Sequence, residues 1–176
     1  MGELARRYPP QSLVISTGAE AASRESDAGF AQPIDRAAIR ATRLRTINGL
    51  ALWTWRAGTL ARRWRPEFAW CGELKPAGYP AWWLMRRYGI PYGVVVHGTE
   101  LLLLEAKIDR SRFKRWTASA LLRDAAVLVA NSAWTAGLAR SVYGQLGRPD
   151  LAARVEVVPL GTEPALFRPG IDATAV

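Results

Sequence analysis

Two ionisable side chains lie three positions apart in His97-Gly98-Thr99-Glu100. His97 is the only histidine of the chain, and imidazole titrates near neutral pH, so it suits proton transfer or charge stabilisation. Gly98 would let the backbone approach a ligand closely, since glycine has no side chain. These residues are therefore candidates for chemistry. The alternative interpretation is that His97 ends a strand and only hydrogen-bonds a neighbouring carbonyl group.

A strand must position this group. Residues 94–96 are three successive valines between Pro91 and Gly98, a pattern typical of a buried strand because branched side chains suit the pleat and Gly or Pro bounds it. In open α/β sheets, ligands bind just beyond the carboxyl ends of the strands. The sequence therefore predicts that His97 lies where such a ligand would bind.

Strand and helix patterns alternate along the rest of the chain. We predict strands at 13–16, 67–71, 94–96, 126–130 and 155–159. We predict helices at 2–7, 35–66, 76–88, 108–124 and 132–146, and a loop at 18–33. The strands are continuous apolar runs, which favours an α/β fold with a Rossmann-like, doubly wound parallel sheet and helices on both faces.

Size and composition indicate one globular domain. The chain has 176 residues, 49% of them hydrophobic and 22% charged, which is too short for two ordinary domains and unlike a disordered chain. The single cysteine, Cys71, excludes an internal disulfide and suits a reducing compartment. No apolar run reaches the ~20 residues of a membrane span, and the start lacks the apolar core of a signal peptide. We expect a cytoplasmic protein.

The net charge of +9 favours anionic partners: nucleic acid, phosphorylated substrates or an acidic membrane surface. A nucleic-acid module is disfavoured, because zinc-ligand spacing is absent and the tryptophans fall at helical core spacing. One histidine and one cysteine are too few for a metal site. A dinucleotide-dependent oxidoreductase is disfavoured because no GxGxxG follows any predicted strand.

The segment from Arg36 to Arg65 has two interpretations. As a sheet-covering helix, it turns an apolar stripe inward (Leu44, Ile47, Ala51, Trp55) and leaves its arginines in water. As an interfacial helix, its arginines and tryptophans contact the surface of an anionic bilayer. The sequence leaves both open.

Three segments together resemble a known family. They are His97-Gly-Thr-Glu100, then Val129-Ala-Asn131-Ser132-Ala-Trp-Thr, then Val157-Val-Pro-Leu-Gly161-Thr-Glu163 with Phe167-Arg-Pro169. In order and spacing they are similar to the N-terminal domain of retaining GT-B glycosyltransferases of family 4. The likeness is strongest from Pro91 to Pro169.

The resemblance implies two Rossmann-like domains across a cleft, of which this half binds the acceptor. It implies sugar transfer from a nucleotide-sugar with retained configuration and without a metal or other cofactor; several family members act on lipid-linked acceptors. It places His97 at the reacting centre as the catalytic residue. It further implies substrate binding by Gly98, Glu100, Asn131, Ser132, Gly161 and Glu163.

Two of these implied roles keep alternatives. Glu100 either orients His97 or an acceptor hydroxyl, or is a solvated loop carboxylate. Ser132 either caps the helix that follows it or helps that helix N-terminus bind an anion.

The chain also departs from the family pattern. The family begins with a strand and a Gly-Gly loop that are not found here, and it continues into a donor-binding domain. We therefore expect residues 1–169 to form the N-terminal domain without its first, central strand, and residues 170–176 to begin an interdomain linker. With the C-terminal donor domain absent, we expect the chain alone to be inactive. The alternative is a non-catalytic module that binds an anionic acceptor, a membrane surface or a protein partner.

Overall fold

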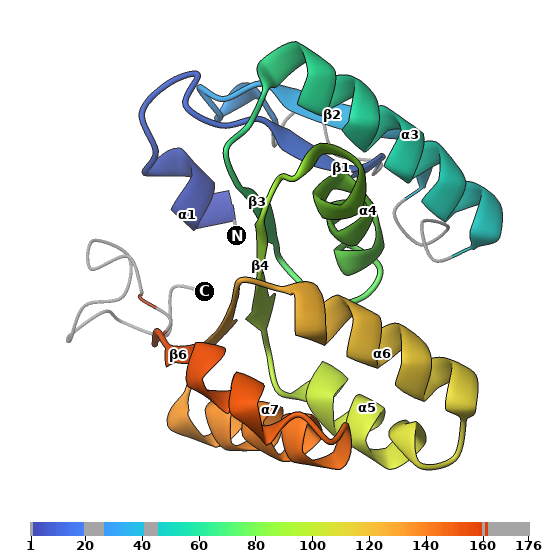
Figure 1. Cartoon of the computed structure of the whole chain (residues 1–176). Helices are drawn as coiled ribbons and strands as arrows, with labels where there is room; N and C mark the ends of the chain where they lie inside the picture. Colours follow the sequence, from blue (N-terminus) through green and yellow to red (C-terminus); the bar gives the residue numbers. More distant parts are fainter. Residues whose placement is uncertain (1, 20–26, 41–45, 160, 162–176) are drawn as a thin grey trace, which may run out of the picture.

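The structure, a computed structural model, describes residues 2–19, 27–40, 46–159 and 161. It is an α/β arrangement of parallel strands flanked by helices, which confirms the predicted Rossmann-like class (Figure 1). The strands are β1 (Ile15–Ala19), β2 (Ile34–Arg40), β3 (Ala69–Cys71), β4 (Tyr92–Val96), β5 (Val127–Ala130) and β6 (Val155–Val157). The helices are α1 (Gly2–Arg6), α3 (Ile47–Trp64), α4 (Gly78–Tyr88), α5 (Thr99–Ile108), α6 (Arg112–Asp124) and α7 (Ala133–Gln145), with a 3-10 helix η2 (Pro149–Arg154).

The described strands form two parallel sheets. One has the order β1-β2 and the other the order β3-β4-β5-β6. Among the described residues, no strand pairs with both β1 and β3. The two parallel sheets are therefore not joined to each other by strand pairing. In Figure 1, α4 and α6 lie on one side of β3 and β4, and α1 lies on the other.

The main core lies under α4, α5, α6 and α7. All five residues of β4 are buried, and Tyr92, Val94 and Val96 pack there with Leu128 and Ala130 of β5. The alternate residues of β5, on its other face, are only half-buried. Because all of β4 is buried in the core, the strand is held in place, and His97 has a fixed position at its carboxyl end.

The first part of the predicted helix 35–66 is wrong. Residues 34–40 form β2, which pairs in parallel with β1 from Ile15↔Ile34 onward. Long-range contacts explain the strand: Arg36 donates to both carboxylate oxygens of Asp27 at 2.7 and 2.6 Å and to the carbonyl of Gly18 at 2.7 Å. Such pairing outweighs local helical spacing, which is a weak determinant by itself. Residues 41–45, including Arg43 and Leu44, lie outside the described residues.

The helix itself, α3, begins after Thr46, whose hydroxyl accepts the N–H of Gly49, and ends at Arg65 with φ 46°. Its buried face consists of Gly49, Trp53, Ala57, Gly58 and Ala61. The predicted inward stripe is therefore wrong, because Ile47, Ala51 and Trp55 face solvent. The indole of Trp53 donates to the Ser16 hydroxyl at 3.0 Å and so ties α3 to β1.

Two further predictions need correction. The helix expected at 108–124 is α6 alone, capped by Ser111, and the apolar run after Thr99 forms a separate helix, α5. The strand expected at 13–16 begins at Ile15 and continues to Ala19. The helices at 76–88 and 132–146 and the strands near 69, 94, 127 and 155 are confirmed to within a few residues.

Candidate functional site

His97 follows β4 directly, at the carboxyl end of the strand, and is exposed. Its ring Nε2 lies 3.0 Å from the carbonyl oxygen of Gly72, which follows β3. A carbonyl oxygen only accepts hydrogen bonds, so Nε2 carries the proton in this contact. In the neutral ring, Nδ1 then keeps its lone pair as an acceptor. The carbonyl contact of the alternative interpretation therefore exists, and it leaves one ring nitrogen for other chemistry.

The Glu100 carboxylate joins two loops beside His97. One oxygen accepts the backbone N–H of Leu74 at 2.8 Å, and the other accepts the backbone N–H of His97 at 3.3 Å. Burial raises the pKa of Glu100, and these two hydrogen bonds oppose that increase. Glu100 is thus a partly buried clamp between the turn before α5 and the loop before α4. Its hydrogen bond with His97 comes from the backbone N–H of that residue.

Gly98 adopts a conformation that few other residues accept. Its φ is 80°, and a Cβ placed on it would lie 2.8 Å from Cζ3 of Trp134. The close approach that glycine allows here is therefore to the indole of Trp134. The helical core spacing of the tryptophans favours buried positions, yet 60% of Trp134 is exposed.

Asn131 and Ser132 follow β5, next to His97. The register pairs Val96 with Ala130, so both strands end at one level and these residues emerge side by side. Ser132 Oγ accepts the N–H of Thr135 at 3.1 Å, the capping bond expected at a helix start. The Thr135 hydroxyl donates to Asn131 Oδ1 at 2.7 Å, and consequently Ser132 is the donor in its 3.0 Å contact with Thr135 Oγ1.

The third predicted segment lies only partly within the described residues. Gly161 is exposed, and no atom of the other described residues lies within 4 Å of the position that a Cβ would take on it. Glu163 and Phe167-Arg168-Pro169 lie outside the described residues. The structure therefore brings together His97, Gly98, Glu100, Asn131 and Ser132 at the carboxyl ends of β4 and β5.

Sequence reasoning missed two neighbours of this site. The helical core spacing of the tryptophans does not show which face of a short helix meets the core, so it does not reveal that Trp134 is exposed. Lys75, in the loop after β3, donates to the Thr117 hydroxyl at 3.1 Å. Burial, with the nearby charge of Lys114, lowers the pKa of Lys75. No local pattern marks Lys75, because Thr117 is distant in the sequence.

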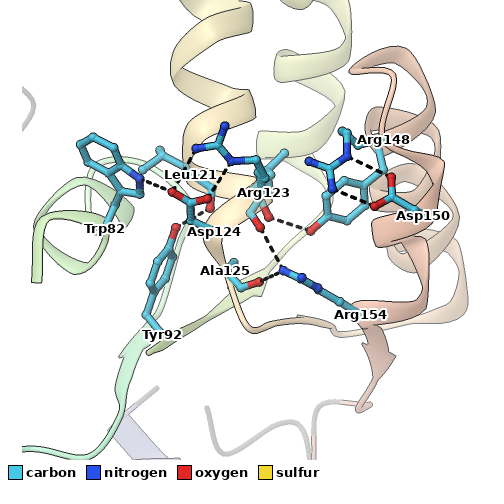
Figure 2. Close-up of polar contacts among 11 residues, drawn as sticks. Trp82, Tyr92, Leu121, Arg123, Asp124, Ala125, Arg148, Asp150 and Arg154 are labelled. Carbon is cyan, nitrogen blue, oxygen red and sulfur yellow. Dashed lines mark hydrogen bonds and ion pairs between the residues drawn. The ribbon is translucent and has the colours of Figure 1, made fainter. Parts of the chain in front are cut away.

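The amino ends of the same strands carry a different polar cluster (Figure 2). Asp124 accepts from the Trp82 indole at 2.9 Å and from Arg123 at 2.8 Å, and the hydrogen bond with Arg123 lowers the pKa of Asp124. Arg154 donates to the carbonyls of Arg123 and Ala125 at 2.9 and 2.8 Å. The charged side chains at the amino ends of these strands therefore hydrogen-bond other residues of the protein and stabilise the fold.

Three findings bear on the site, one on metal ligands and two from comparisons with known proteins. Within the described part of the chain, no three His, Cys, Asp or Glu side chains are grouped so as to hold a metal ion. No curated protein matches the chain. The family model for Glycosyltransferase Family 4 matches residues 3–166.

Proposed function

The chain belongs to glycosyltransferase family 4, and from that premise we propose that it forms the acceptor-side half of an enzyme that transfers a sugar from a nucleotide-sugar to an acceptor. The family match over residues 3–166 carries this proposal. In it, the configuration at the anomeric carbon is retained, and neither a metal nor another cofactor takes part. A second, donor-binding domain supplies most contacts to the nucleotide.

His97 is the residue that we assign to the reacting centre. Its Nε2 is held by Gly72, and its Nδ1 is the nitrogen left to accept a hydrogen bond from a sugar hydroxyl. An imidazole in this place would orient the sugar and stabilise positive charge that develops at its anomeric carbon. Glu100 supports His97 as a positioning residue, since its carboxylate fixes the backbone on both sides of the ring contact.

Acceptor binding tests this function without requiring turnover. We expect the chain to bind at least one saccharide from a panel of soluble sugars and lipid-linked saccharides in micelles, measured by ligand-observed NMR. His97→Ala should weaken that binding about tenfold, the effect of about one lost hydrogen bond. Asn48→Ala, an exposed change at the start of α3, is the control and should bind as the wild type does.

Two results would contradict the proposal. One is a folded wild-type chain that binds no saccharide of the panel. The other is a transfer product, formed when the chain is assayed with nucleotide-sugars and a donor domain, whose anomeric configuration is inverted relative to the donor.

The acceptor also bears on location. None of the helices in the described ranges is long and apolar enough to cross a membrane. We propose peripheral contact with the cytoplasmic face of an anionic membrane, where a lipid-linked acceptor would be reached. The part of the Arg36–Arg65 segment that supports this contact is α3, because it turns Ile47 and Trp55 outward, 86% and 64% exposed.

A further inference from the structure

A groove runs between α3 and α4, which lie side by side in Figure 1. We call it the α3–α4 groove; its volume is about 580 Å³. Its lining includes Ala51, Trp55 and Arg62 of α3 and Trp83, Arg87 and Tyr88 of α4. Gly58 brings the helices together, because its missing side chain leaves room for the Trp83 ring, 2.9 Å from the position of a Cβ.

Positive charge is concentrated in this groove. Arg62 donates to the Tyr88 hydroxyl at 2.9 Å, and the Arg87 guanidinium lies 5.3 Å from the centre of the Tyr88 ring. None of the lining residues is acidic. Within the described part of the chain, neither Arg62 nor Arg87 has an acidic partner. The arginines Arg123 and Arg148 in Figure 2, by contrast, are paired with carboxylates.

An apolar stripe borders the same groove. Ile47, Ala51 and Trp55 are four residues apart on α3, so they share one face, and all three are exposed. The opposite face of α3 buries Trp53 and Ala61 in the protein. The helix therefore has one apolar face toward the core and another toward the solvent. Packing in the core explains the first of these faces but not the exposed one.

We propose that the α3–α4 groove binds the phosphate of an anionic phospholipid, with Arg62 and Arg87 on the phosphate and the Ile47–Trp55 stripe at the headgroup–acyl boundary. This inference rests on the peripheral membrane contact proposed above and assigns its site. Guanidinium groups pair well with phosphate oxygens, and indoles favour the bilayer interface. A nucleic acid or an acidic protein would match the charge but would leave Ile47 without an apolar environment.

Vesicle co-sedimentation tests the site. We expect the wild-type chain to bind phosphatidylcholine vesicles that contain about one-third phosphatidylglycerol, and to bind pure phosphatidylcholine vesicles at least tenfold more weakly. The double variant Arg62→Gln, Arg87→Gln should lose about tenfold in partitioning, since each basic side chain near an anionic surface contributes several-fold. Arg110→Gln, Arg112→Gln is the matched control: it removes the same charge from exposed positions elsewhere and should lose less than twofold.

A second variant keeps the test valid if the arginine variant unfolds. Trp55→Ser removes the exposed indole and should weaken vesicle binding, whereas Trp116→Ser, which removes an indole 63% exposed on α6, should not. Circular dichroism verifies the fold of each variant.

The outcomes separate the two proposals. Failure of the wild type to bind anionic vesicles overturns both the membrane contact and the groove. Equal losses in the groove and control variants overturn the groove alone, because general charge would then explain binding. Tighter binding to an oligonucleotide than to vesicles would overturn the phospholipid as the occupant. His97→Ala should bind vesicles normally, so a failed acceptor assay does not affect this result.

Discussion

His97 and Gly72 are joined across two neighbouring strands: the imidazole Nε2 lies 3.0 Å from the Gly72 carbonyl oxygen. The contact crosses from the residue after β4 to the residue after β3, and these strands pair in parallel. This hydrogen bond therefore fixes the imidazole of the single histidine at the carboxyl ends of the strands. The site thus has one defined donor and one acceptor nitrogen when the ring is neutral.

This contact predicts the tautomer of His97. When the ring is neutral, we expect the proton on Nε2 and the lone pair on Nδ1, because the Gly72 carbonyl can only accept. Ring ¹⁵N chemical shifts measured by long-range ¹H–¹⁵N correlation distinguish the two forms. A folded chain in which Nδ1 carries the proton would contradict the prediction, and the urea-unfolded chain gives the reference shifts.

Glu100 predicts a pH dependence of stability. Burial raises its pKa, so the folded chain holds this proton more tightly than the unfolded chain does. As pH rises from the ordinary carboxyl range through the raised pKa, the unfolded state loses its proton first and the Glu100 contribution to stability falls. Glu100→Gln cannot titrate, and it also leaves one backbone N–H of the clamp without an acceptor.

We therefore expect Glu100→Gln to unfold more easily than the wild type at every pH, with a difference in melting temperature that shrinks as pH rises. Thermal unfolding followed by circular dichroism across the acidic range measures it. Glu67→Gln, at an exposed position, controls for loss of one charge. A difference that stays constant or grows with pH would show that Glu100 is not a burial-shifted carboxyl.

Gly98 predicts a local steric penalty. Gly98→Ala places a Cβ at φ 80° and 2.8 Å from the Trp134 ring, so we expect a loss of about 1–3 kcal/mol in the free energy of unfolding. Gly137→Ala is the control, since it lies in α7 with open space around it and should be neutral or stabilising by about 0.4–1 kcal/mol. Urea unfolding measures both. Equal effects of the two substitutions would contradict the assigned role of Gly98.

Ser132 predicts a result that separates its two possible roles. Its hydroxyl both accepts from and donates to Thr135, which favours the capping role. Ser132→Ala should cost about 1 kcal/mol of folding free energy, and Ser132→Asp, also a good cap, should restore it. Saccharide binding by Ser132→Asp should equal that of the wild type. Loss of binding in this variant would indicate that Ser132 contacts an anionic ligand.

Trp134 predicts an effect on acceptor affinity. Its ring packs on Gly98 beside His97 and remains 60% exposed, so it offers a flat apolar surface to the face of a sugar ring. Trp134→Ala should weaken saccharide binding about tenfold, the factor that ~1.4 kcal/mol represents. Trp134→Phe should keep most of the affinity, and Trp116→Ala should have no effect. Unchanged binding by Trp134→Ala would remove this residue from the site.

The sequence by itself determined the α/β class, the β4 strand, the place of His97 after it and the Ser132 cap. These depend on residues close together in the chain: three successive valines suit a buried strand, and a hydroxyl before a helix satisfies its free N–H groups. The strands β3, β4, β5 and β6 were predicted for the same reason. The family resemblance added the expected roles.

The tertiary structure alone decided the features that depend on distant residues. Residues 34–40 are a strand because they pair with β1 and because Asp35 forms an ion pair with Arg56 on α3. The exposed stripe on α3 and the position of Trp134 against Gly98 follow from which helix face meets the core. Helical spacing fixes which side chains share a face, but only packing against other elements decides whether that face is buried.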